Sequence, residues 1–252
     1  MKLQVLLLFL AAGLICCNNN PAPGTSVVSK IKTGTIEVKD TLPLWDTIKN
    51  AASNSDTFKR FEVDDFPVTD KMLTCNDNNG ACELKYKELI SLDKIWFTND
   101  TINQTLVFEM YTDKHRLATF LFGNNNIPAD LIKAMEFNTA DGEVAPNKLK
   151  LEHFKGFIPL ARKINSTYFK SNKGFKLGDT KEKFIKEYGK PDNIETVKGV
   201  EEYYWEFIGD LLYDDKKDLK NKPLAKDNYG HQATMFFLNN KLIGLVLHND
   251  IP

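Results

Sequence analysis

The chain has 252 residues, of which 42% are hydrophobic and 27% are charged, so it can bury a core and is globular rather than disordered. Its 33 Lys and Arg residues nearly balance its 34 Asp and Glu residues. This balance argues against the concentrated basic surface that nucleic-acid binding requires, and we expect no nucleic-acid partner.

The first segment predicts an exported protein. Lys2 supplies a small positive charge, and the apolar run from Val5 to Ile15 has the length of a secretory signal rather than of a membrane span. The run ends in Leu14-Ile15-Cys16-Cys17, which resembles the lipobox of bacterial lipoproteins. In that family a Leu lies three residues before the Cys that is lipidated and becomes the new N-terminus. The resemblance implies a signal peptide at residues 1–16 and lipidation of Cys17. Cys16 is the alternative register, and an ordinary cleaved signal peptide is the alternative interpretation.

Residues 17–43 are predicted to form a flexible tether. The part from Asn18 to about Thr35 is polar, contains Pro21 and Pro23, and shows no hydrophobic periodicity. Such a segment cannot bury enough surface to fold. Acyl chains on Cys17 would then hold the protein at a membrane surface without spanning it.

Two further cysteines, Cys75 and Cys82, flank a polar stretch rich in turn-forming residues. In an exported protein such a pair is expected to form a local disulfide, with a stabilisation of about 2–3 kcal/mol on the chain-entropy model. A calcium loop is the alternative that Asp77 and Gly80 suggest. It is disfavoured because Cys75 occupies the first ligand position and Tyr86 the place of the bidentate Glu. We expect no metal and no cofactor.

Residues 44–148 predict an N-terminal α+β domain. The turn at Asp113-Lys114 would join two strands into an antiparallel hairpin. A helix after it would place Leu131, Ile132 and Met135 on one face. The expected elements are a short helix at 44–52, strands at 94–98, 105–111 and 115–122, and a helix at 126–136.

Residues 149–252 predict a C-terminal α+β domain. Its best-specified helix follows Asp179, which is expected to cap it while Glu182 reaches back, as in a capping box. Gly189 suits the left-handed position after the helix, and Pro191 prevents its continuation. Expected strands lie at 193–198, 201–207, 231–238 and 241–248, with Asn239-Asn240 as a tight turn.

This order of elements resembles the SmpA/OmlA-like fold, which occurs in a small lipoprotein of the outer-membrane protein assembly machinery and in secreted β-lactamase-inhibitor proteins. The likeness covers about residues 172–249 and implies a fold rather than an active site. The long N-terminal half and the insert at residues 209–230 depart from the family. The hairpins at 105–122 and 231–248 are similar in length, so two loosely similar halves are a further expectation. The residues that carry the likeness are Gly178, Thr180, Phe184, Tyr188, Gly189 and Pro191, with the terminal hairpin.

No catalytic signature is present, and we assign no catalytic residue. The sequence contains no GxSxG, SxxK, P-loop or GxGxxG motif. His231 and His248 could face each other across the open end of the last hairpin, although two histidines at strand ends are the simpler interpretation.

The insert at residues 209–230 is the best candidate for partner binding, because long loops inside compact domains often bind something. Its acidic residues, which begin at Asp210, are matched by lysines, and this mixture of charges predicts a solvated loop. In the preceding strand, Tyr203, Trp205 and Phe207 alternate onto one face, which we assign to the core. The hypothesis is a partly exposed aromatic patch for a protein or glycan partner, made of Tyr204, Tyr213 and Tyr229.

Together these patterns predict an α+β protein with antiparallel sheets and short helices, in two loosely similar halves behind a lipidated tether. The expected location is a membrane of the cell envelope, in particular the outer membrane of a Gram-negative bacterium. The expected function is non-enzymatic binding or scaffolding of another envelope protein. A small envelope hydrolase or transferase is the alternative. A secreted inhibitor or stress-response factor follows from fold analogy alone.

Overall fold

The computed structural model describes residues 60–74, 82–111, 115–139, 151–211, 223–226 and 229–250. All of these belong to one compact unit, Thr41–Pro252. The predicted signal peptide, tether and first helix lie outside the described residues, as do the predicted turn at 113–114, Cys75 and Tyr213. Within the described ranges no helix is long and apolar enough to cross a membrane.

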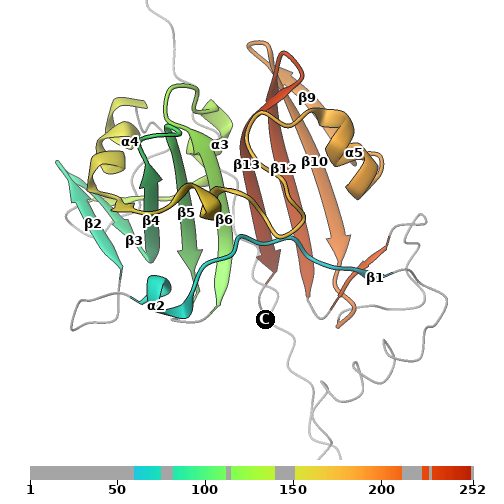
Figure 1. The fold of residues 1–252 in the computed structure, drawn as a ribbon, viewed down its shortest axis with the longest axis horizontal. Coiled ribbons are helices and arrows are strands. Elements are labelled where there is room, and N and C mark those ends of the chain that lie inside the picture. Colours follow the sequence, from blue (N-terminus) through green and yellow to red (C-terminus); the bar gives the residue numbers. More distant parts are fainter. Residues whose placement is uncertain are drawn as a thin grey trace, which may run out of the picture. The chain divides into compact units, whose positions relative to one another are not determined.

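The main feature is an eight-stranded sheet in the order β8-β4-β5-β6-β13-β12-β10-β9 (Figure 1). All neighbouring strands are antiparallel except β4 and β8. The strands are β4 (Lys94–Asn99), β5 (Gln104–Met110), β6 (Arg116–Gly123), β8 (Arg162–Lys163), β9 (Asn193–Val197), β10 (Val200–Ile208), β12 (Gly230–Leu238) and β13 (Lys241–Asp250). Two small sheets accompany it: β2 (Glu83–Tyr86), β3 (Leu89–Leu92) and β7 (Asn138–Thr139); and β1 (Arg60–Phe61) with β11 (Leu224–Ala225).

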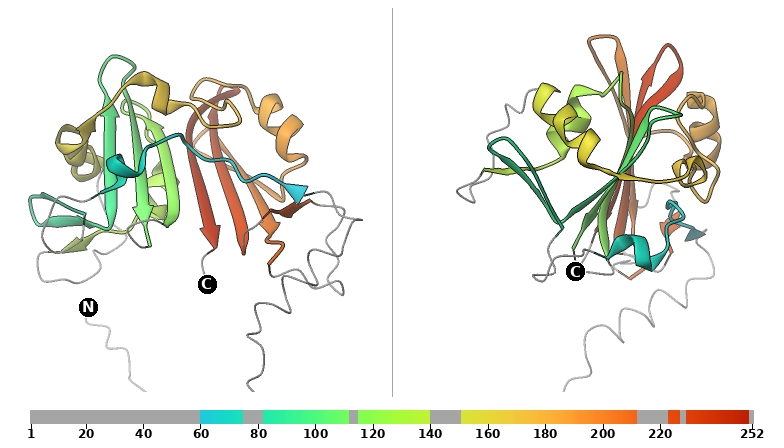
Figure 2. Two further views of the ribbon diagram at one scale, coloured as in Figure 1. Left: turned by 60° about the horizontal axis from the view of Figure 1, so that its bottom comes forward. Right: turned by 60° about the vertical axis from the view of Figure 1, so that its left-hand side comes forward.

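The helices are short and lie on both faces of the sheet (Figure 2). Phe184 of α5 packs in the core cluster that contains Trp205 and Phe97, whereas Leu131 of α3 and Phe154 of α4 pack in the cluster on the opposite face. The predicted α+β class with antiparallel sheets is thereby confirmed. The helices are α2 (Asp70–Leu73), α3 (Ala129–Ala134), α4 (Leu151–Phe157) and α5 (Lys181–Tyr188), with the 3-10 turns η1 (Ile158–Leu160) and η2 (Ser166–Phe169).

Strands β6 and β13 join the two halves of the chain. They pair from Phe122 opposite Gly244 to Ala118 opposite His248. The predicted hairpins at 105–122 and 231–248 are both present, and this pairing places them in one sheet. The domain boundaries expected after residues 16, 43 and 148 stay predictions.

Strand β10 follows the predicted alternation. Tyr203, Trp205 and Phe207 are buried in the core, and the Trp205 indole N–H donates to the Gly189 carbonyl at 3.0 Å. That carbonyl belongs to the left-handed glycine (φ 81°) that ends α5, so the helix and the strand are fixed to each other. The turn between β12 and β13 is also as predicted, with φ of 51° at Asn239 and 61° at Asn240.

The predicted capping box of α5 is wrong. The helix begins at Lys181 with Thr180 as its N-cap, one residue later than expected. Asp179 lies before the cap, where its carboxylate accepts from the Lys176 N–H at 3.1 Å and pairs with Lys183 at 2.6 Å. Glu182 accepts from the Asn240 side chain at 3.2 Å instead.

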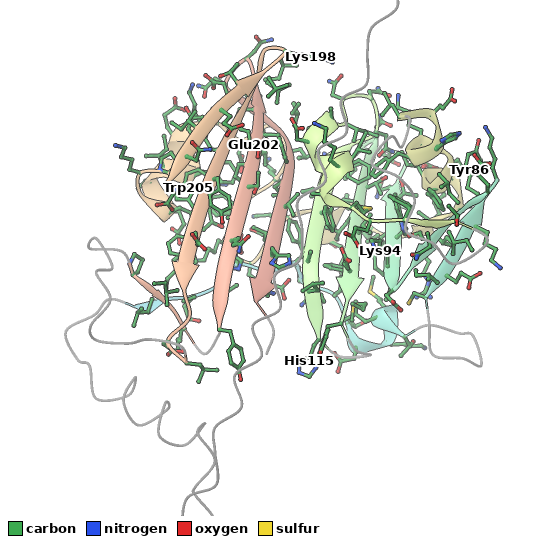
Figure 3. The ribbon with its side chains drawn as sticks, turned by 180° about the vertical axis from the view of Figure 1, so that it is seen from behind. Tyr86, Lys94, His115, Lys198, Glu202 and Trp205 are labelled. Atoms are coloured by element: carbon green, nitrogen blue, oxygen red, sulfur yellow. The ribbon has the colours of Figure 1, made fainter. Side chains whose placement is uncertain are left out.

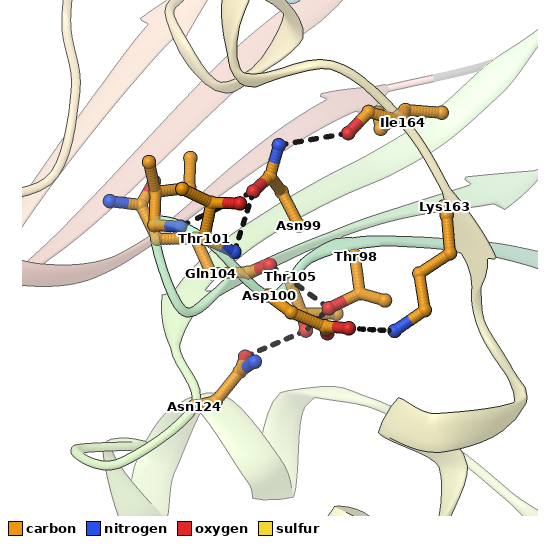
Figure 4. Close-up of polar contacts among 10 residues, drawn as sticks. Thr98, Asn99, Asp100, Thr101, Gln104, Thr105, Asn124, Lys163 and Ile164 are labelled. Carbon is orange, nitrogen blue, oxygen red and sulfur yellow. Dashed lines mark hydrogen bonds and ion pairs between the residues drawn. The ribbon is translucent and has the colours of Figure 1, made fainter.

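The turn between β4 and β5 attaches the edge strand β8 (Figure 4). The Asn99 side-chain oxygen accepts from the N–H groups of Thr101 and Ile102, while its amide nitrogen donates to the Ile164 carbonyl at 2.9 Å. Lys163 of β8 pairs with Asp100 of the same turn. One turn therefore organises its own backbone and holds the neighbouring strand.

A crossing segment, residues 61–74, runs over the sheet face that α5 also covers (Figure 1). Arg116 of β6 pairs with Asp65 and donates to the Phe66 carbonyl at 3.2 Å. At one end, β1 pairs in parallel with β11, whose two residues are fully buried. The insert at 209–230 therefore contributes to the core, and Asp210, expected in a solvated loop, is only 6% exposed.

Candidate functional site

The candidate site lies on the open face, which we define as the side of β10, β12 and β13 opposite α5. Figure 3 views the sheet from this side and labels Glu202. The strand register arranges the open face in three rows: Glu202, Phe236 and Gly244; Tyr204, Thr234 and Val246; and Glu206, Gln232 and His248.

Two adjoining hollows form a groove along this face. Their volumes are about 430 and about 300 Å³, and they share Asp130, Glu202 and Phe236. The larger hollow has polar and acidic walls over an apolar floor that includes Phe120 and Val246. The smaller one is mainly apolar. It is lined by Asn125, Asn126, Ile127, Pro128, Ala129, Leu151, Val197, Lys198, Val200, Leu238 and Ile243 in addition to the shared residues.

Helix α3 forms one wall of the groove because a glycine lets it approach β13. A Cβ atom at Gly244 would lie 3.0 Å from the Leu131 side chain and 3.0 Å from the Pro128 ring. Leu131 and Ile132 are buried against the sheet, as predicted. Asp130 and Ala134 of the same helix line the larger hollow.

The groove contains four carboxylates, and they differ in how they are neutralised. Glu109 lies 3.3 Å from the Lys94 ammonium, which is only 5% exposed. Asp130 pairs with Lys133 one helical turn away. Among the residues that the structure describes, no cation forms an ion pair with Glu202. The fourth carboxylate, Glu136, is exposed to solvent and also has no ion pair among the described residues. Glu202 is therefore the half-buried carboxylate of the groove whose charge no described cation pairs.

Glu202 also has acidic neighbours. Partial burial raises the pKa of its carboxyl above the ordinary 4.5, and the charges of Asp130 and Glu195 raise it further, while Lys133 acts in the opposite direction. Glu195 lies directly opposite Glu202 in the β9–β10 register. Like charges in this arrangement destabilise a sheet. A partly buried carboxylate of this kind in a cleft is typical of a binding site.

Two of the three tyrosines of the predicted aromatic patch lie among the described residues. Tyr204 lies on the open face, half-buried, in the middle of β10. Tyr229 precedes β12, where its carbonyl accepts from the Gly209 N–H at 2.8 Å. About 17 Å of strand separates these two positions at ~3.4 Å per residue. Because Tyr213 lies outside the described residues, the patch stays a prediction.

The two histidines at the ends of the last hairpin lie on opposite faces of the sheet. His231 pairs with Asn249 and is fully buried beside Phe61 and Phe207, with its Nδ1 2.9 Å from the Asn249 side-chain oxygen. His248 pairs with Gln232 and lines the groove. The idea that they face each other is wrong, because adjacent strand positions point to opposite faces. No described group of three His, Cys, Asp or Glu residues is placed to hold a metal ion.

The predicted cysteine roles fall largely outside the described residues. Cys82 is buried and disulfide-bonded. Cys75, its expected partner, and Cys17, the expected lipidation site, are not described, so the pairing and the lipidation stay predictions.

Sequence reasoning missed Glu202 and Asp130 as site residues. Local sequence offered one signal for Glu202, a charged residue at an outward position of a strand whose alternate residues are aromatic. Asp130 carried no such signal, because it reaches Glu202 only through the packing of α3 on β13.

No protein-family model and no curated protein sequence matches the chain. Among solved structures, the chain is similar to a candidate beta-lactamase inhibitor protein from Streptococcus mutans, with 11% sequence identity over 68% of this chain and 75% of that one. The TM-score of 0.20 is too low to establish a common fold or a common function. The groove is therefore interpreted from the residues of this chain alone.

Proposed function

We propose that this protein is a lipid-anchored binding protein of the cell envelope, which holds a segment of another envelope protein in the groove. The observation that supports this most directly is the groove itself, in which polar side chains surround an apolar floor. Its two hollows, of about 430 and about 300 Å³, are within the usual size range of binding clefts.

The anchor in this proposal comes from the sequence. Leu14 to Cys17 resembles a lipobox, and the polar segment after it suits a tether. Diacylation of Cys17 would hold the protein at the membrane surface, and the outer membrane of a Gram-negative bacterium is the location we propose.

Site-specific photocrosslinking tests the binding role. A benzoylphenylalanine residue is placed at Ala134, which is exposed and lines the groove, and at Thr101, which is exposed on the β4–β5 turn. The full-length protein is expressed in its own envelope. We expect one envelope protein to crosslink at Ala134 but not at Thr101. Equal crosslinking at both positions, or none at Ala134, would contradict the proposal.

Metabolic labelling with an alkyne fatty acid tests the anchor. Cys17→Ala should abolish labelling and move the protein from the membrane to the soluble fraction, whereas Cys16→Ala should leave both unchanged. If Cys16→Ala alone abolished labelling, the register would be wrong; if neither did, the protein would not be a lipoprotein.

A further inference from the structure

The charge on the open face is incompletely balanced within the chain. Glu202 and Glu195 oppose each other across β9 and β10, and Asp130 approaches Glu202 from α3. Lys133 is engaged by Asp130, and Lys94 by Glu109. Neither lysine forms an ion pair with Glu202. Lys198 lines the smaller hollow from the β9–β10 turn. An added positive charge beside Glu202 would relieve the repulsion among these carboxylates.

The other end of the groove is apolar. The smaller hollow presents Val200, Leu238 and Ile243 around Phe236, which is shared with the larger hollow. Leu151, 44% exposed, and Val197, 39% exposed, lie at its rim. Apolar side chains left this exposed beside a hollow are typical of contact surfaces. A ligand that fits both ends must carry a cationic group and an apolar group.

The length of the groove indicates an extended ligand. Gln232 lines one end and Leu238 the other, about 20 Å apart along β12 at ~3.4 Å per residue. An extended peptide covers this distance with about six residues. A single free amine would fill only a small part of it.

From these three features we infer that the groove binds an extended, basic peptide segment of the partner protein. A Lys or Arg of the segment pairs with Glu202, and an apolar side chain near it packs on Phe236 in the smaller hollow. This inference rests on the proposed function, since it names the chemistry of the segment that the groove would hold.

Peptide binding to the full mature protein in nonionic detergent tests the inference. The probe is acetyl-Leu-Lys-Lys-Leu-Leu-Lys-amide with an uncharged dye, because in this order each face of the extended peptide carries both Lys and Leu. Binding is followed by fluorescence anisotropy at pH 7.5. We expect the affinity of this peptide to exceed by at least about tenfold that of the same peptide with acetyl-lysine at each Lys position. Spermidine, which has the charge without the apolar groups, should not displace it at comparable concentration.

Variants of the protein locate the charge. Glu202→Gln should weaken binding of the Lys peptide about tenfold. The control Glu88→Gln removes an exposed carboxylate at the β2–β3 turn and should leave binding unchanged. Binding should also weaken as the pH falls toward the raised pKa of the Glu202 carboxyl, because protonation removes its negative charge. The pH profile of Glu202→Gln should be flatter. The charged groups that face Glu202 are Asp130 and Lys133 of α3 and Glu195 of β9.

Each result decides separately on the inference and on the proposed function. Equal affinity for the acetyl-lysine peptide, or full displacement by spermidine, overturns the basic-peptide inference. If the crosslink at Ala134 still forms in that case, the protein binds a partner of another chemistry and the proposed function stands. If the crosslink is absent as well, both are wrong.

Discussion

The buried side chain of Tyr188 combines a closely packed ring with an unpaired hydroxyl. Its ring lies in the core, with ring centroids 5.4 Å from Phe61, 5.5 Å from Phe175 and 5.5 Å from Trp205. Its hydroxyl is buried and has no hydrogen-bond partner within the described structure. Burial and the nearby Asp64 raise the pKa of this hydroxyl well above its ordinary value of 10, so it stays neutral at physiological pH.

Removing this hydroxyl should stabilise the protein. An unpaired buried hydroxyl loses its hydrogen bonds to water on folding, at a cost of about 1–3 kcal/mol. Tyr188→Phe keeps the ring and removes one oxygen, which leaves little empty space. Because part of the gain is offset by lost contacts, we expect the free energy of unfolding to rise by about 1 kcal/mol. For a protein of this size, that is an increase in Tm of about 2–4 °C.

Urea denaturation of the full chain, followed by tryptophan fluorescence at pH 7.5, measures this change. Tyr203→Phe is the matched control, since Tyr203 lies in the same core cluster but has the Lys181 ammonium beside its hydroxyl. It should give no gain. A loss of stability in Tyr188→Phe, or equal shifts in both variants, would show that the Tyr188 hydroxyl is not an unsatisfied group.

Three further predictions concern the walls of the groove and the crossing segment. Gly244→Val should cost about 1–3 kcal/mol in unfolding free energy, because the new side chain meets Leu131 and Pro128. Gly123→Val should cost less in the same denaturation assay, because a Cβ there would lie 3.8 Å from Leu177. Arg116→Met should lower the unfolding free energy by about 1–2 kcal/mol, since it removes the partner of Asp65 and the donor to the Phe66 carbonyl. An unchanged urea midpoint would mean that Arg116 does not hold the crossing segment in place. Glu202→Gln should make the protein more stable than wild type at pH 7.5, by less than about 1 kcal/mol after solvent screening. The raised pKa of the Glu202 carboxyl means that the folded wild-type protein binds this proton more tightly than the unfolded chain does. The unfolding free energy of the wild-type protein therefore falls as the pH rises above 4.5. The difference between the wild-type protein and the variant should vanish by about pH 4 in urea titrations.

Local sequence patterns were sufficient for the long strands of the main sheet and for the end of α5. The alternation of Tyr203, Trp205 and Phe207 and the glycine at position 189 act through neighbours in the chain, and both predictions are confirmed. The start of α5 was missed because Asp179 is engaged by Lys176 and Lys183, a competition that propensity alone does not reveal.

The groove could not be predicted because it depends on contacts between distant segments. Glu202 and Asp130 meet only because β6 pairs with β13 and Gly244 admits α3. The short strand β11 was missed for a related reason. Leu224–Ala225 is too brief to show a period, and its pairing with β1 is set by residues far away in the chain.

The position of β13 in the sheet has a consequence for how the chain matures. Strand β13 lies between β6 and β12, so this place in the sheet stays vacant until residues 241–250 have been synthesised. Until residues 241–250 arrive, β6 and β12 each present an unpaired edge, the feature that makes nascent sheets prone to aggregate. A chain that emerges N-terminus first therefore needs residues 241–250, or a chaperone that shields β6, before this sheet can form.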